Sequence, residues 1–196
     1  MATHLVTDSR IRSARAIAVG SATRILLTPV VMWLVLYEDG DSAELVAAVL
    51  FAIAAATDWI DGRLARRWGV TTKLGSFLDT TADKLLVSGV LIALLEAGRA
   101  SAWIVAVIVG RELVVMGLRG VVASEGDVMQ PSMLGKVKTS IQFLAIILAI
   151  LRPGDEIAGL YIDEWAMLAA AAITVYSAAD YLVRVLPAVA REDRQA

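Results

Sequence analysis

Residues 57–84 read TDWIDGRLARRWGVTTKLGSFLDTTADK, and this stretch decides the fold. Asp58 and Asp61 are three positions apart, and Asp79 and Asp83 are four apart, so each pair lies on one face of a helix. Uncharged apolar runs precede the first pair and follow the second. The stretch therefore predicts two consecutive helices whose joined ends carry four carboxylates.

The overall composition points to lipid as the solvent of this chain. Of its 196 residues, 58% are hydrophobic and 19% charged, and the mean hydropathy is +0.70. A soluble domain is about 45–50% apolar and about 25% charged, and a single domain of this length could not bury the surplus. The lack of cysteine excludes disulfides and thiolate metal sites. The net charge of −2 argues against a nucleic-acid partner.

Six apolar runs predict an all-α integral membrane protein with six transmembrane helices. The runs are residues 16–37, 45–57, 85–95, 100–110, 139–151 and 165–179. Most are shorter than the roughly 20 residues that a straight span needs, so they must extend into charged sequence, always toward the same side if the helices alternate. Because charge at membrane depth is costly, we expect a polar cavity open to that side. A weakly hydrophobic bundle with ragged ends is the alternative.

The distribution of lysine and arginine orients the predicted spans. The loops on the side away from the cavity carry only Arg99 and Arg152, so the positive-inside rule places the cavity and both termini in the cytoplasm. The first residues are expected to form a short amphipathic interfacial helix or, alternatively, a solvated basic tail. One membrane domain over 1–196 would then comprise an N-terminal helix at 1–20, a six-helix bundle at 21–188 and a cytoplasmic tail at 189–196.

Four carboxylates at the mouth of a cavity repel one another unless cations lie between them. Oxygen-only ligands suit Mg²⁺ or Mn²⁺, and two such ions about 3.5–4 Å apart could clamp a diphosphate. The aspartates at 58, 61, 79 and 83 are therefore the predicted ligands of two divalent cations. The alternative is that they cap helices and form salt bridges with the basic residues between the two pairs.

The same stretch resembles the signature of the CDP-alcohol phosphotransferase family. It fills every fixed position of D-x2-D-G-x2-A-R-x8-G-x3-D-x3-D, whereas intramembrane prenyltransferases lack the Gly-x2-Ala-Arg element. The resemblance implies six spans, a cytosol-facing site, a homodimer, and two metal ions on Asp58, Asp61 and Asp79. It implies that Asp83 both touches a metal and accepts the acceptor's proton. The residues expected to bind CDP-diacylglycerol are Arg24, Gly62, Ala65, Arg66, Thr72 and Gly75.

Two further elements are similar to a bacterial branch of this family that uses glycerol 3-phosphate. The first is the Arg-x4-Pro element at Arg24, and the second contributes four cations. Arg111 and Arg119 are about 80° apart around a helix, so both can face one cavity, whereas Lys136 and Lys138 differ by about 200°. These four are the predicted ligands of the acceptor's phosphate. The alternative is that they snorkel to the inner membrane interface.

The predicted function is therefore transfer of a phosphatidyl group from CDP-diacylglycerol to glycerol 3-phosphate at the bacterial plasma membrane, with release of CMP and with Asp83 as the base. Inositol phosphate, phosphatidylglycerol or serine stay open as alternative acceptors within the family. Outside it, the alternative is a cation transporter with a carboxylate-lined cavity. A transporter needs access from both leaflets, and nothing acidic or broken marks the outer halves of the predicted spans.

Overall fold

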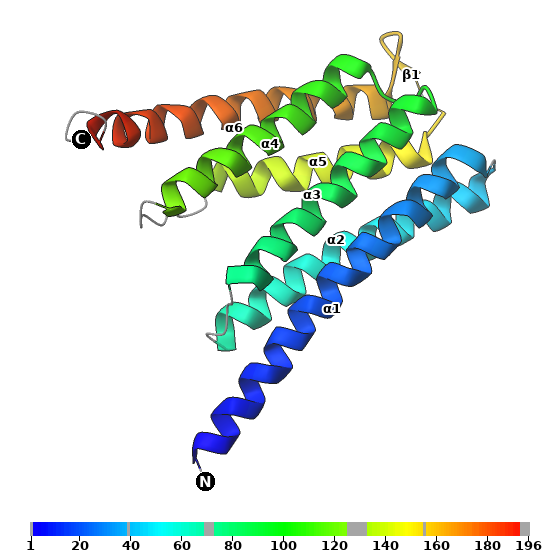
Figure 1. Ribbon diagram of the computed structural model, residues 1–196. Coiled ribbons are helices and arrows are strands. Elements are labelled where there is room, and N and C mark those ends of the chain that lie inside the picture. The colour runs from blue at the N-terminus through cyan, green and yellow to red at the C-terminus, as the bar shows by residue number, and fades with distance from the viewer. Residues whose placement is uncertain (1, 39, 69–72, 125–132, 155, 193–196) are drawn as a thin grey trace. The chain divides into compact units, whose positions relative to one another are not determined.

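The computed structural model of this chain is built almost entirely from helices (Figure 1). It describes the backbone at residues 2–38, 40–68, 73–124, 133–154 and 156–192, and the side chains at 19–38, 40–57, 77–123, 134–154 and 156–185. Within these residues the helices are α1 (Ala2–Tyr37), α2 (Asp41–Trp68), α3 (Lys73–Glu96), α4 (Ala102–Ser124), α5 (Met133–Leu151) and α6 (Ile162–Glu192). The described residues form six helices, where six transmembrane helices and a short N-terminal helix were predicted, so the all-α class is confirmed.

Three of these helices are long and apolar enough to cross a membrane, counting only the residues described. The spans are Val19–Tyr37 in α1, Leu134–Leu151 in α5 and Ile162–Val185 in α6. The helices α2, α3 and α4 contain the shorter apolar runs that need charged extensions, so their crossing of the membrane stays a prediction. Large apolar side chains also point outward, with Leu26 69% and Trp103 83% exposed, as expected where lipid is the solvent.

The expectation of a separate N-terminal interfacial helix is wrong. The structure has one helix that runs from Ala2 to Tyr37. The first glycine in the chain is Gly20 and the first proline is Pro29, so no residue that breaks helices lies between the basic stretch and the first apolar run. Because each added residue supplies one more backbone hydrogen bond, the helix continues without interruption. The division of the chain into segments 1–20, 21–188 and 189–196 stays a prediction.

The helices pack in two compact units, Met1–Ala97 and Gly98–Ala196. In the first unit α1 packs against both α2 and α3. The buried residues of α1 recur every three or four positions, which places them in one stripe along the helix. This stripe consists of Ser21, Arg24, Thr28, Val31 and Val35. Its C-terminal part is apolar and its N-terminal part is polar, and the polar part places Arg24 beside Asp79 of α3.

Glycine is required where α1 and α3 pack most closely. A Cβ atom at Gly89 of α3 would lie 2.7 Å from Thr28 Cγ2 and 3.1 Å from Met32 Sδ. The first of these distances is shorter than any normal contact between carbon atoms. The absence of a side chain at Gly89 therefore sets the separation of the two helices.

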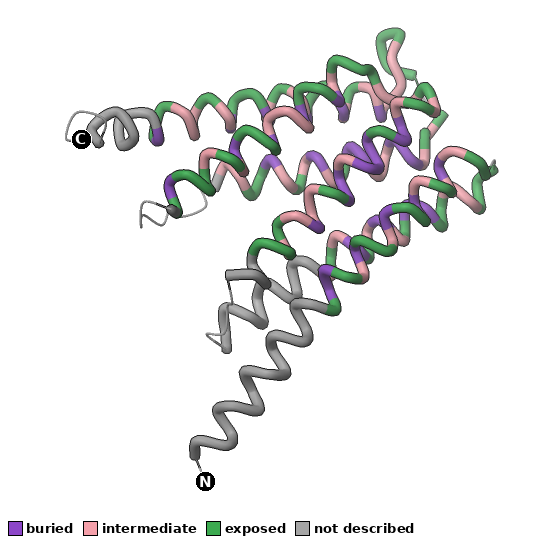
Figure 2. Tube along the Cα trace, viewed as in Figure 1, coloured by how far each residue is buried: buried purple, intermediate pink, exposed green. Residues whose placement is uncertain are grey.

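In the second unit α6 packs against both α4 and α5, and Figure 2 shows buried positions distributed along these helices. Up to Ser177 the buried stripe of α6 again follows a spacing of three and four, and Val185 lies eight positions further on; its residues are Asp163, Met167, Ala170, Thr174, Ser177 and Val185. Its middle is polar. A buried polar stripe needs hydrogen-bond partners, and the helix α4 supplies some of them, as described below.

The predicted outer loop at 152–164 contains a short hairpin that the sequence did not reveal. Strands β1 (Glu156–Ile157) and β2 (Leu160–Tyr161) pair antiparallel. The turn residues Ala158 and Gly159 have φ of 55° and 81°, the conformation that two-residue hairpin turns require. The Trp165 indole N–H donates a hydrogen bond to the Ile157 carbonyl at 2.9 Å, which ties the hairpin to the start of α6.

Candidate active site

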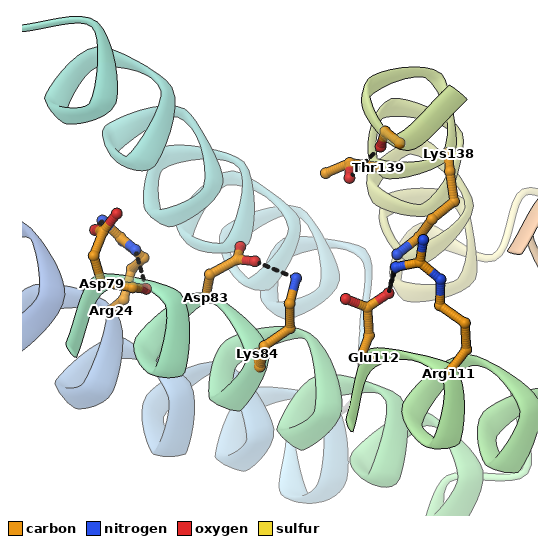
Figure 3. A network of polar contacts seen from close by, with 9 residues as sticks. Arg24, Asp79, Asp83, Lys84, Arg111, Glu112, Lys138 and Thr139 are labelled. Atoms are coloured by element: carbon orange, nitrogen blue, oxygen red, sulfur yellow. Dashed lines mark hydrogen bonds and ion pairs between the residues drawn. The ribbon is translucent and has the colours of Figure 1, made fainter. Parts of the chain in front are cut away.

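Asp79 is held by a buried arginine. The Arg24 guanidinium donates one hydrogen bond from Nη2 to Asp79 Oδ1 at 2.7 Å and another from Nη1 to the Asp79 carbonyl oxygen at 3.2 Å (Figure 3). The Arg24 side chain is fully buried, and that of Asp79 is 28% exposed. One bond to the carboxylate and one to the backbone of the same residue hold the planar guanidinium against Asp79. Arg24, expected from the sequence to bind CDP-diacylglycerol, here lies against one of the predicted metal ligands.

Asp83 lies one helical turn beyond Asp79 on α3. Its Oδ2 accepts a hydrogen bond from Lys84 Nζ at 2.8 Å, and the aspartate side chain is 16% exposed. Within the part of the chain that is described, the second carboxylate oxygen of each aspartate has no hydrogen-bond partner. Two partly exposed carboxylates with spare oxygens fit a hard divalent cation by donor chemistry.

The rest of the predicted acidic site lies outside the described side chains. Six of its residues, Asp58, Asp61, Gly62, Ala65, Arg66 and Gly75, belong to the helical backbones of α2 and α3, and Thr72 lies outside the described residues altogether. Among the described residues no group of three or more acidic or histidine side chains forms a metal centre. The metal and nucleotide roles of these seven residues therefore stay predictions.

The predicted acceptor cations belong to the second unit, where two of them share one carboxylate. Lys138 of α5 and Arg111 of α4 both donate hydrogen bonds to Glu112 Oε1, the latter at 3.2 Å (Figure 3). Lys138 and Glu112 are almost completely buried, at 2% and 3% exposed, whereas Lys136 is exposed. The two lysines thus lie on different faces of α5, as their 200° separation predicts.

Helix α6 contributes residues that the sequence analysis did not single out. Arg111 Nη2 donates a hydrogen bond to Ser177 Oγ at 2.9 Å, and the Arg119 guanidinium lies 5.6 Å from the centre of the Tyr181 ring. Both arginines of α4 therefore face α6, in agreement with their predicted 80° separation. The polar residues at 174, 177 and 181 repeat at intervals of three and four, and this spacing was the signal available in the sequence.

The described residues thus comprise a helical protein of membrane-like composition, with two carboxylates on α3 and a basic cluster on α4 and α5. The family model for CDP-alcohol phosphatidyltransferases matches residues 18–176, and the chain belongs to this family. The resemblance inferred from residues 58–83 is thereby confirmed. Members of the family generally use divalent cations.

Three relatives of this chain carry the same name. The protein called CDP-diacylglycerol–glycerol-3-phosphate 3-phosphatidyltransferase in Bacillus subtilis is 41% identical over 170 residues, which cover 81% of this chain and 88% of that protein. The protein of the same name in Sodalis glossinidius is 41% identical over 71% of this chain and 78% of its own length. The one in Salmonella choleraesuis is 37% identical over 81% and 88%.

Proposed function

We propose that this protein transfers the phosphatidyl group of CDP-diacylglycerol to glycerol 3-phosphate, forming phosphatidylglycerophosphate and CMP. The observation that carries the proposal is the identity of 37–41% to proteins named for this reaction, over most of both chains. The basic cluster of the second unit supports it independently, because an uncharged alcohol acceptor would not need a site for phosphate.

The carboxylates of the first unit are suited to the diphosphate end of the reaction. Asp79 and Asp83 would hold divalent cations together with Asp58 and Asp61, and Arg24 would keep the Asp79 carboxylate in one orientation. When bound, Mg²⁺ or Mn²⁺ would neutralise the diphosphate and stabilise the charge that develops on the departing CMP. Gly62, Ala65, Arg66, Thr72 and Gly75 are the proposed contacts of the CDP moiety.

The chemical step is a displacement at the phosphorus that carries the diacylglycerol. The primary hydroxyl oxygen of glycerol 3-phosphate attacks this phosphorus, the bond from phosphorus to the CMP oxygen breaks, and CMP leaves with the bonding electrons. Asp83 accepts the hydroxyl proton. Proton removal by a positioned carboxylate is worth about 10²–10⁴-fold in rate, and the Asp83 side chain, 16% exposed, is accessible from solvent.

The acceptor's phosphate is assigned to Arg111, Arg119, Lys136 and Lys138. Glu112 pairs with Arg111 and Lys138. A phosphate monoester would complement the positive charges of the four cations. Of the four, Lys136 is the weakest candidate, since its side chain is exposed on another face of α5.

The membrane arrangement is part of the same proposal. Six spans with both termini in the cytoplasm would open the site to the cytoplasmic leaflet of the bacterial plasma membrane, where CDP-diacylglycerol and a water-soluble acceptor can meet. The asymmetry of basic residues between the two sides supports this orientation. A homodimer is proposed on the family resemblance.

The test is CMP release from CDP-diacylglycerol by the purified enzyme in detergent micelles, with Mg²⁺ or Mn²⁺ and with one acceptor at a time. We expect turnover with glycerol 3-phosphate and little with inositol phosphate, phosphatidylglycerol, serine or free glycerol. Asp79→Asn is the control variant and should lose turnover. Preference for another acceptor would replace the substrate assignment, and absence of CMP release with all of them would reject the enzyme in favour of a transporter.

A further inference from the structure

Three polar residues lie in one stripe on α6, in the half of the helix that faces Arg111 and Arg119. Thr174, Ser177 and Tyr181 are separated by three and four positions, which places them within about 60° of one another around the helix. Thr174 and Ser177 are 0% and 2% exposed. An apolar residue would cost less at such positions, because buried hydroxyls must be satisfied by hydrogen bonds.

Two of these hydroxyls and one nitrogen of Arg111 have no partner. Within the described part of the chain, the buried atoms Thr174 Oγ1, Tyr181 Oη and Arg111 Nε make no hydrogen bond. Orphaned buried polar atoms are rare in proteins and call for an explanation such as a ligand. The Arg111 Nε–H can only donate and the tyrosine hydroxyl readily donates, so a ligand that reaches both atoms would have to offer acceptor oxygens.

The charges around these atoms identify the kind of group. Arg111 reaches Ser177 of α6, and the Arg119 guanidinium lies over the Tyr181 ring of the same helix. Glu112 accepts a hydrogen bond from Arg111, and two like charges that face one helix favour a further anion beside them. A phosphate monoester has the charge and the three terminal oxygens that two guanidinium groups and a phenol can bind together.

We propose that Tyr181 donates its hydroxyl hydrogen bond to the acceptor's phosphate and that Ser177 positions Arg111 for the same phosphate. This inference rests on the proposed function for the identity of the acceptor. Both residues lie beyond residue 176, where the match to the family model ends, so the family resemblance does not assign them. Helix α6 would thereby contribute to acceptor specificity, because its hydroxyl groups act together with the cations of α4 and α5.

The decisive variant is Tyr181→Phe, which keeps the ring under Arg119 and removes only the hydroxyl. We expect the KM for glycerol 3-phosphate to rise roughly 10- to 150-fold, the range for a lost hydrogen bond to a charged group. The kcat and the KM for CDP-diacylglycerol should change less than about twofold, and the residual rate with free glycerol should not change. Tyr176→Phe is the matched control on the same helix, because Tyr176 is 60% exposed, and it should behave as the wild type.

Ser177 provides a second test if Tyr181→Phe does not fold. Ser177→Ala should raise the KM for glycerol 3-phosphate, and Ser177→Thr, which keeps the acceptor oxygen for Arg111, should restore it. An unchanged KM in both Tyr181→Phe and Ser177→Ala would overturn the inference. So would a rise confined to CDP-diacylglycerol, since that result would assign the hydroxyl to the diphosphate.

Calorimetric titration with inorganic phosphate separates this inference from the proposed function. If the wild type does not use glycerol 3-phosphate, the proposed function fails, and phosphate binding alone decides the inference. Weaker phosphate binding by Tyr181→Phe than by Tyr176→Phe would support it. Equal binding by the two variants would overturn it.

Discussion

Replacing Gly89 with alanine should destabilise the protein although alanine favours helices. The new Cβ would lie 2.7 Å from Thr28 Cγ2. Thr28 cannot easily rotate away, because its side chain is buried and its hydroxyl donates a hydrogen bond to the Arg24 carbonyl at 2.8 Å. Relief therefore requires α1 and α3 to separate, and these helices also hold Arg24 against Asp79.

The size of the effect follows from two opposing terms. Alanine stabilises a helix by about 0.8–1.0 kcal/mol relative to glycine, whereas an extra methyl group in a packed interface costs about 1–3 kcal/mol. Gly117→Ala is the matched control, because Gly117 lies within α4 and a Cβ there meets nothing within 4 Å. The helix term cancels between the two variants, so Gly89→Ala should be about 1–3 kcal/mol less stable than Gly117→Ala.

Thermal unfolding of the purified protein in one detergent measures this difference. For a chain of this length it corresponds to a Tm lower by about 2–12 °C in Gly89→Ala than in Gly117→Ala. Thr28→Ser removes the clashing methyl and keeps the hydroxyl, so the double variant Thr28→Ser/Gly89→Ala should regain most of the loss relative to Thr28→Ser alone. Equal Tm values for Gly89→Ala and Gly117→Ala would refute the close packing of α1 on α3.

Three further outcomes are expected. Asp83→Asn should slow CMP release by about 10²–10⁴-fold and leave CDP-diacylglycerol binding, measured by calorimetry, much less affected; equal losses would assign Asp83 to metal binding alone. Arg119→Ala should raise the KM for glycerol 3-phosphate roughly 10- to 150-fold, with only partial recovery in Arg119→Lys because an ammonium cannot bind phosphate bidentately; the same loss toward free glycerol would make the arginine structural. Glu112→Gln and Lys138→Met should each lower the free energy of unfolding by about 3–5 kcal/mol, because each leaves a buried polar or charged partner behind. The double variant should recover much of this loss, and additive losses in a denaturation series would show that the pair does not interact.

The number of helices and the class of enzyme were readable from the sequence because both depend on local patterns. The apolar runs are separated by charged or turn-forming residues, and each run becomes one helix whatever its neighbours do. The spacing of Asp79 and Asp83 places both on one face of α3 without any knowledge of the packing. The signature over residues 58–83 is likewise a local pattern, and it led directly to the family.

Local pattern did not decide where the first helix begins or what sits between 152 and 164. The basic stretch before Val19 favours an interfacial helix by composition, yet no residue interrupts the backbone hydrogen bonds that carry α1 through it. The hairpin of β1 and β2 depends on a positive φ at Ala158, which nothing about alanine announces. In the first place the continuous backbone hydrogen bonds of α1 outweighed the composition of the segment, and in the second the turn imposed a φ that alanine rarely adopts.

Only the tertiary structure decided which partners the charged residues take. The pairing of Arg24 with Asp79 joins positions 55 residues apart, and Ser177 meets Arg111 across 66. Sequence spacing gives the face of a helix on which a side chain lies, but it does not say which other helix packs against that face. The sequence therefore determined the chemical groups of the carboxylate pair on α3 and of the basic cluster on α4 and α5. The packing of α1 on α3, and of α6 on α4 and α5, determined which carboxylate each cation holds, because a buried charge is stable only beside the partner that the fold brings to it.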